Sequence, residues 1–412
     1  MTAYWCELAW LGGSGVEAGV LIECAGGRIA RIASGAQEGA AERLPGLTVP
    51  GFANAHSHAF QRALRGRTQA PSGGSFWTWR EQMYALASSL DPDRSYALAR
   101  ATFAEMALAG ITLVGEFDYV HHSRAVISAA ADAGIRMTLI DACYLHGGLD
   151  RFHDADADAW AARVASLEPL PPHVRLGAAI HSVRAVDPES AAVVAAFAAS
   201  LELPLHAHVS EQPAENEECL SRHGATPLAV LAEAGALSER FTAVHATYFS
   251  DEDARLLAAS GAYCCLCPTT ERDLADGIGV PSGRLTLGSD SQAVIDMFEE
   301  ARAVELDERL RTGVRGVYAG ADLLRAATLN GYQSLGWPEG GRLEEGALAD
   351  FVAVRFDGVR LAGTRPEDAV DAVVFAAGAG DVDTVVAGGA TIVRGGRHLY
   401  VDVAAELEAA IP

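Results

Sequence analysis

The sequence predicts a (β/α)8 TIM barrel with a small β-sandwich domain formed by both ends of the chain. Three observations predict this fold. The middle of the chain alternates strand and helix patterns, whereas both ends carry short apolar runs separated by glycine. Histidines and acids gather where the predicted barrel strands end. We therefore expect a barrel over residues 49–340, and small-domain segments over residues 1–48 and 341–412.

Eight apolar segments in the middle of the chain follow one another at intervals that fit βα units. They are residues 50–58, 113–119, 137–143, 174–181, 203–209, 241–246, 262–267 and 285–290. Asp91-Pro92 opens one of the helices between them, because Asp caps a helix and proline is tolerated at its first position. Apolar residues recur at helical spacing from there until Gly110, a natural stop.

The two ends of the chain share a sequence pattern that differs from that of the middle. Short runs typical of antiparallel strands occupy residues 19–23 and 27–32 near the start, and residues 349–354, 384–389 and 391–396 near the end. We expect these strands to pair into one small β domain, with the barrel inserted between its two halves.

Composition limits the classes of partner. The chain has 412 residues, is 50% hydrophobic and 21% charged, and carries a formal net charge of -23. This charge argues against nucleic acid and against anionic membrane surfaces. We find no apolar run of about eighteen residues that would predict a membrane span. An anionic substrate would need a local cluster of cations.

The cysteines and the N-terminus favour a cytoplasmic protein. Seven cysteines are an odd number without framework spacing, which fits reduced thiols, and residues 1–7 do not have the pattern of a signal peptide. Cys264, Cys265 and Cys267 cluster on one predicted strand, where adjacent residues face opposite sides. We interpret them as buried small hydrophobic residues rather than as a zinc site.

The first barrel strand ends in a His-x-His pair, His56 and His58. Side chains alternate along a strand, so the two imidazoles face the same way and can bind one ion. Further candidates end other strands: His206, His208 and Glu211 on the fifth, His245 on the sixth and Asp290 on the eighth. One histidine at a strand end is usually structural, but histidines at three ends with two acids predict a metal-dependent active site.

These motifs resemble the amidohydrolase superfamily over nearly the whole chain, including the stretch from Gly341 to Phe351 that resembles its return into the small domain. Within it, the chain is most similar to the formimidoylglutamate deiminases of histidine degradation. The narrower resemblance rests on five strings: His56 to Arg62, Ser75 to Glu81, Glu116 to His122, His181 to Val186, and His208 to Gln212. It implies hydrolysis of N-formimidoyl-L-glutamate to N-formyl-L-glutamate and ammonia, and a homodimer.

The resemblance also implies a single zinc ion, held by His56, His58, His208 and Asp290, with water as the remaining ligand. Nitrogen and carboxylate ligands with one open position are typical of catalytic zinc, which lowers the pKa of water toward neutrality. No lysine ends the fourth predicted strand, where a bridging carbamate would support a second ion.

Catalytic roles follow from the same match. We expect Asp290 to accept the proton of the water, and His245 to stabilise the developing charge. Glu211 is placed to protonate the imino nitrogen of the substrate and then the departing ammonia. His206 is expected to be structural.

The substrate carries two carboxylates, and arginine binds carboxylate with two parallel bonds. The family strings place Arg80 and Arg184 in loops at the mouth of the barrel, and match Gln61, Tyr119 and His181 to positions that hydrogen-bond the substrate. One departure is Gln292, where the resemblance would lead us to expect histidine supporting Asp290.

Two alternatives remain open. The metal set fits equally an aminohydrolase of purines or related heterocycles, which would not depend on Arg80 and Arg184. A third hypothesis is a zinc-dependent binding or scaffold protein on an inactive barrel. The presence of both Glu211 and His245 argues against it, since a pure binding protein needs neither acid nor base.

Overall fold

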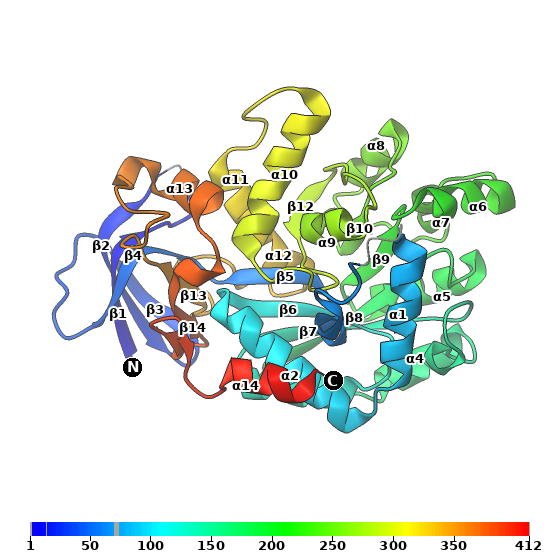
Figure 1. The fold of residues 1–412 in the computed structure, drawn as a ribbon, viewed down its shortest axis with the longest axis horizontal. Helices are drawn as coiled ribbons and strands as arrows, with labels where there is room; N and C mark the ends of the chain where they lie inside the picture. Colours follow the sequence, from blue (N-terminus) through cyan, green and yellow to red (C-terminus); the bar gives the residue numbers. More distant parts are fainter. Residues whose placement is uncertain (1, 14, 70–73, 412) are drawn as a thin grey trace.

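The computed structural model of the chain describes residues 2–13, 15–69 and 74–411. Eight parallel strands form a barrel in the middle of the chain (Figure 1), hydrogen-bonded in sequence order. They are β5 (Phe52–Ser57), β6 (Ile111–Asp118), β7 (Arg136–Cys143), β8 (Val174–Ile180), β9 (Leu205–Val209), β10 (Phe241–His245), β11 (Tyr263–Leu266) and β12 (Arg284–Leu287). A parallel bridge between Ser57 and Asp290 joins the first strand to the segment after the last. The predicted barrel is therefore confirmed.

The barrel strands are almost wholly buried, which explains why they appear as continuous apolar runs rather than as alternating patterns. Helices surround them: α1 (Phe76–Ser88), α2 (Pro92–Leu108), α3 (Ser123–Ala133), α4 (Ala157–Ala165), α5 (Pro188–Ser200), α6 (Pro213–His223), α7 (Pro227–Glu233), α8 (Asp251–Ala259), α9 (Pro268–Asp273), α10 (Met297–Thr312), α11 (Gly320–Arg325) and α12 (Gly331–Ser334). α2 begins as predicted, because Asp91 accepts a hydrogen bond from the backbone N–H of Arg94.

The two ends of the chain form a second eight-stranded sheet beside the barrel, at the left of Figure 1. Its strands are β1 (Thr2–Ala9), β2 (Glu17–Ala25), β3 (Arg28–Ala33), β4 (Glu42–Pro50), β13 (Phe351–Val354), β14 (Val382–Ala387), β15 (Ala390–Arg394) and β16 (Arg397–His398). The halves meet where β13 pairs antiparallel with β4. One pair, β1 with β4, is parallel, so the sheet is not antiparallel throughout.

The C-terminal segment also returns to the barrel. α13 (Ala369–Ala376) packs against α10 and α11, and α14 (Val403–Ala410) lies against α2, where the chain ends (Figure 1). Part of the segment 341–412 thus packs on the barrel as well as forming the second sheet. The domain boundaries at residues 48/49 and 340/341 stay a prediction. No helix in the described part of the chain is long and apolar enough to cross a membrane.

Candidate active site at the carboxyl ends of the barrel strands

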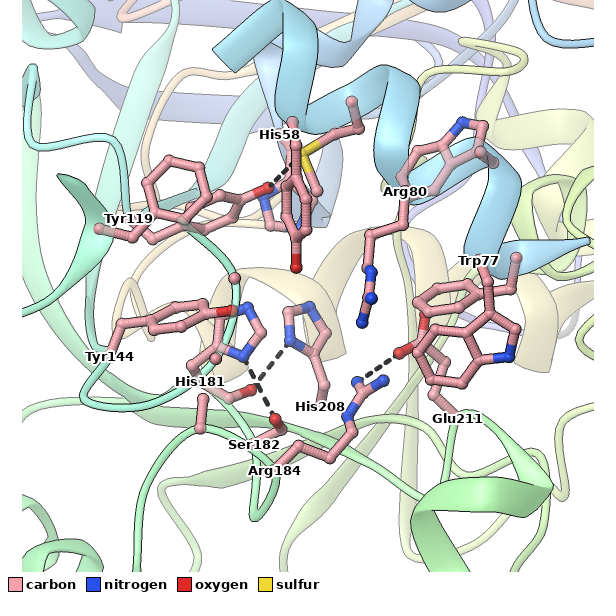
Figure 2. A pocket seen from close by; sticks show the side chains of 18 of the residues that line it. His58, Trp77, Arg80, Tyr119, Tyr144, His181, Ser182, Arg184, His208 and Glu211 are labelled. Carbon is pink, nitrogen blue, oxygen red and sulfur yellow. Dashed lines mark hydrogen bonds and ion pairs between the residues drawn. The ribbon is translucent and has the colours of Figure 1, made fainter. Parts of the chain in front are cut away.

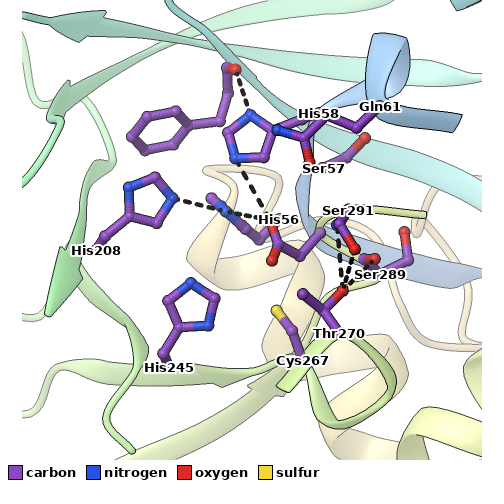
Figure 3. A network of polar contacts seen from close by, with 12 residues as sticks. His56, Ser57, His58, Gln61, His208, His245, Cys267, Thr270, Ser289 and Ser291 are labelled. Atoms are coloured by element: carbon purple, nitrogen blue, oxygen red, sulfur yellow. Dashed lines mark hydrogen bonds and ion pairs between the residues drawn. The ribbon is translucent and has the colours of Figure 1, made fainter. Parts of the chain in front are cut away.

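Four side chains predicted as metal ligands converge at the carboxyl ends of β5, β9 and β12 (Figure 3). The Nε2 atoms of His56 and His208 lie 3.1 Å apart. Asp290 Oδ1 lies 3.3 Å from His56 Nε2 and 3.4 Å from His58 Nε2. All four side chains are buried. Three imidazole nitrogens and a carboxylate at this spacing can bind one divalent ion.

The backbone holds two of these segments in register. Asp290 donates its N–H to the carbonyl of His56 at 2.9 Å, and His58 donates its N–H to the carbonyl of Asp290 at 3.1 Å. Asp290 has a φ of +42°, a conformation that L-residues rarely adopt. The bonds to β5 stabilise this conformation and aim the carboxylate at the histidines.

Backbone carbonyls also orient the imidazoles. His58 Nδ1 lies 3.1 Å from the carbonyl oxygen of Phe117, and His208 Nδ1 lies 2.9 Å from that of His181. Each carbonyl favours a proton on Nδ1, which leaves the Nε2 lone pair free for a metal.

Burial keeps these ligands ready for a cation. It lowers the pKa of His58 to about 3, and lowers the pKa values of His56 and His208 as well. Burial alone would raise the pKa of Asp290, but the hydrogen bond and charge of His56 outweigh it and lower that pKa below its ordinary value. Three neutral imidazoles and an ionised carboxylate are the protonation states that a metal requires.

Gln292 supports the Asp290 loop. Its Nε2 donates to the carbonyl of Asp290 at 2.8 Å and to Ser57 Oγ at 3.0 Å, and its Oε1 accepts from Ser289 Oγ at 2.7 Å. The residue is fully buried. Glutamine therefore joins the two ligand-bearing segments at the position where the resemblance predicts histidine.

His245, at the end of β10, lies between two carboxylates. Its Nε2 is 3.9 Å from Glu211 Oε1, and its Nδ1 is 3.5 Å from Glu271 Oε1. Burial lowers the pKa of His245, but Glu271, Glu211 and Asp290 outweigh that effect and raise it to about 10. The ring is therefore a cation at neutral pH, able to stabilise negative charge nearby.

Arg184 reaches Glu211 directly, which the sequence did not predict. Arg184 Nη2 donates to Glu211 Oε2 at 2.6 Å, and Arg184 Nε lies 3.8 Å from Glu215 Oε2. The predicted carboxylate-binding arginine thus contacts the predicted acid. Its guanidinium has five N–H groups, so this contact does not use up its capacity to bind a second carboxylate.

A cavity of about 260 Å³ opens over the metal ligands. Arg80 and Arg184 face it from different elements (Figure 2). Arg80 lies on α1 and stacks over Trp77 and Tyr84, with its guanidinium carbon 4.6 Å and 5.3 Å from their ring centres. Two cations therefore line one cavity of a strongly acidic chain.

The three remaining predicted contacts also line the cavity. Gln61 Nε2 donates to the hydroxyl of Tyr119 at 3.1 Å. His181 packs against the ring of Tyr119, with ring centres 5.5 Å apart. The structure thus brings every residue proposed from the sequence into one site, with His206 buried outside it near the carbonyl of Ser334.

Several residues of the site were not proposed from the sequence. Trp77 is partly exposed and supports Arg80. Tyr144 follows β7 and lines the cavity. Glu271 lies on α9, the helix after β11, beside His245. The rule that found His245, polar residues at the ends of barrel strands, would also have found Tyr144 but not Glu271.

Comparison with known proteins identifies the family. The Amidohydrolase family model matches residues 47–392. The chain belongs to the amidohydrolase family. It is therefore a hydrolase. The resemblance inferred from the sequence is confirmed.

Individual relatives of this amidohydrolase differ in their reactions. The chain is 36% identical to the formimidoylglutamate deiminase of Pseudomonas aeruginosa, over 91% of this chain and 90% of that one. It is 30% identical to a 5-methylthioadenosine/S-adenosylhomocysteine deaminase of Natronomonas pharaonis, over 84% and 81%. Among solved structures, an amidohydrolase from Brucella melitensis matches with a TM-score of 0.89 and 33% identity, covering 100% of this chain and 99% of that one.

Proposed function

We propose that this amidohydrolase hydrolyses N-formimidoyl-L-glutamate to N-formyl-L-glutamate and ammonia, as a step in histidine degradation. The observation that carries the proposal is the pair of guanidinium groups, Arg80 and Arg184, on the cavity that opens over the metal ligands. A dicarboxylate with an amidine end fits a cavity that has cations on its wall and acids at its base. The similarity to the Pseudomonas aeruginosa deiminase supports the same substrate.

We include one zinc ion per subunit in this proposal. His56, His58, His208 and Asp290 would hold it, because their donor atoms are buried, converge and carry the required protonation states. Zinc bound there would lower the pKa of a water molecule toward neutrality.

The protein's own groups would move the protons. Asp290 is an ionised carboxylate with a second oxygen available to accept a proton. His245, a cation 3.9 Å from Glu211, would stabilise the negative charge on the oxygen that attacks the amidine carbon. Glu211 would carry a proton to the imino nitrogen and later to the leaving ammonia.

Substrate positioning would fall to the cavity wall. Arg80 and Arg184 would each bind a carboxylate, and the stacking of Arg80 on Trp77 holds its planar fork in place. Gln61, Tyr119 and His181 lie nearer the metal ligands and would hydrogen-bond the rest of the substrate. Binding energy gained at the carboxylates would then orient the amidine over the acid.

The reaction is tested by its products. Purified enzyme incubated with N-formimidoyl-L-glutamate should release ammonia and N-formyl-L-glutamate in equal amounts. Formation of formamide and glutamate instead would show cleavage of the other carbon–nitrogen bond and contradict the proposal.

A second candidate is deamination of a nucleoside, which the similarity to the Natronomonas pharaonis deaminase supports. Aromatic side chains line the cavity, among them Trp77, Tyr119 and Tyr144. Parallel assays with N-formimidoyl-L-glutamate and 5-methylthioadenosine decide between the two candidates. A higher kcat/KM for 5-methylthioadenosine would favour nucleoside deamination. The homodimer and the cytoplasmic location inferred from the sequence stay predictions.

A further inference from the structure

Behind His245, on the side away from Glu211, lie two more groups that can bind a metal. His245, Cys267 and Glu271 each offer one donor atom, and the three atoms lie within 4.8 Å of one another. All three residues are buried. The proposed reaction uses neither Cys267 nor Glu271.

The orientation of His245 separates two sites. Its Nε2 faces Glu211, and its Nδ1 faces Glu271 at 3.5 Å. Nδ1 is buried, and its only close polar partner among the described residues is this carboxylate, at ion-pair distance rather than in a well-formed hydrogen bond. An ion between Nδ1, the thiol and the carboxylate would contact all three donor atoms.

Cys267 and Glu271 are held in place by the turn that starts α9. Glu271 Oε1 accepts a hydrogen bond from the N–H of Cys267 at 2.9 Å, which fixes the carboxylate beside the thiol. Figure 3 shows the sulfur of Cys267 on the same side of the site as the ring of His245. Nitrogen, sulfur and carboxylate oxygen together form a donor set that suits zinc and other thiophilic ions.

Acidic side chains around the cluster favour the binding of a cation. The charges of Glu211, Glu271 and Asp290 raise the pKa of His245, and they also raise the pKa of the nearby Asp276 carboxyl. The active-site cavity reaches His245, the member of the cluster that both sites share.

We propose that His245, Cys267 and Glu271 form a second, inhibitory site for a thiophilic divalent ion such as excess Zn²⁺ or Cd²⁺. Binding releases two protons to solvent, one from the thiol of Cys267 and one from Nδ1 of His245. A sulfur–metal bond and a nitrogen–metal bond replace them, and no oxidation is involved. The ion then holds the ring of His245 from its Nδ1 side and removes it from the proposed reaction. The site needs only these three side chains, whereas the inhibition rests on the proposed role of His245 in the reaction.

Cadmium tests the site with readouts that do not depend on turnover. Zinc-loaded enzyme would be titrated with cadmium chloride and desalted, and both metals would be counted by mass spectrometry. The ultraviolet thiolate-to-cadmium band would be recorded in parallel, since the four proposed zinc ligands include no sulfur. We expect zinc to be retained, one further ion of cadmium to bind per subunit, the band to appear and activity to fall.

Two variants make the result specific. Cys267→Ser should lose the band and weaken cadmium binding and inhibition by about tenfold or more, because one of three ligands is removed. Cys267→Ala gives the same test if serine disturbs the fold. Cys264→Ser is the matched control, since Cys264 lies on β11, is as buried as Cys267 and belongs to the main hydrophobic core instead. It should respond to cadmium as the unmodified enzyme does.

Three outcomes would overturn the proposal: no further ion bound by the zinc-loaded enzyme, cadmium that replaces zinc without a thiolate band, or an unchanged response in both Cys267 variants. Failure of the proposed substrate would leave metal counts and the band unaffected, so the two proposals can be separated.

Discussion

At the scale of single residues, the contact between Arg184 and Glu211 matters most for the mechanism. Before substrate binds, the guanidinium is paired with the acid at 2.6 Å. A substrate carboxylate would share the same guanidinium, which would weaken its pairing with Glu211 and let that acid exchange protons near the amidine. Substrate binding and the acid would then be coupled through one arginine.

Replacing the acid tests its role. We expect Glu211→Gln to lower kcat by about 10²- to 10⁴-fold, because a positioned proton donor contributes that much, while zinc content stays unchanged. Steady-state kinetics with metal analysis measures both. Glu217→Gln on the exposed side of α6 is the control and should match the unmodified enzyme. Full turnover in Glu211→Gln would contradict the mechanism.

Replacing Arg80 tests the substrate. Arg80→Met should reduce kcat/KM for N-formimidoyl-L-glutamate by about 10- to 100-fold, because a hydrogen bond to a charged group contributes about 1.5–3 kcal/mol. The loss should fall mainly on KM. Arg222→Met, in an exposed ion pair on α6, serves as the control. An Arg80 variant that binds the dicarboxylate normally would favour the nucleoside alternative.

The sequence predicted the proposed ligands because histidine and acid at strand ends leave a local signature. It did not predict the ion pair between Arg184 and Glu211, which are 27 residues apart. That contact depends on the directions of two long side chains across neighbouring strand ends. The contact between His245 and Glu271 was not predicted either, because Glu271 lies on α9 and reaches His245 only through the direction of its side chain.

At the scale of elements, strand length and burial decide what can be predicted. All eight barrel strands lie within the predicted segments to a few residues, because each is a compact apolar run. β1 and β4 were not singled out. β4 carries Pro45 and Gly46 in its interior, which normally argue against a strand.

The backbone at position 46 of β4 requires glycine. Its φ is +64°, and a Cβ added there would lie 2.1 Å from the carbonyl oxygen of Val354. Gly39 has a similar φ of +59°, but its nearest neighbour would be 3.9 Å away. Gly46→Ala should therefore lower the free energy of unfolding by about 1–3 kcal/mol more than Gly39→Ala. Urea unfolding of both variants measures the difference, and equal losses would contradict the predicted clash.

At the scale of the whole molecule, Asp350 links the second sheet to the barrel. It lies just before β13 and is fully buried. Its carboxylate accepts from Arg136 Nε on β7 at 2.7 Å and from the hydroxyl of Tyr332 on α12 at 3.0 Å. The Gly388 N–H adds a third bond at 2.6 Å. The fold class could be predicted, but this buried link could not, because it joins residues 214 apart in the chain.

We expect Asp350→Asn to destabilise the protein by about 3–5 kcal/mol, since it leaves the partly buried Arg136 without its counter-charge. Asp368→Asn, which breaks an exposed pair with Arg365, should cost about 1 kcal/mol or less. Thermal unfolding of the two variants provides the comparison. Similar melting temperatures would show that Asp350 does not couple the sheet to the barrel.

The measurement that tests the account most directly is reconstitution of metal-free enzyme with zinc, followed by assay with N-formimidoyl-L-glutamate. Metal-free enzyme should be inactive. Release of ammonia and N-formyl-L-glutamate should rise in proportion to added zinc and reach its maximum at one ion per subunit. Full activity without metal, or a maximum that requires two ions, would contradict a single-zinc deiminase.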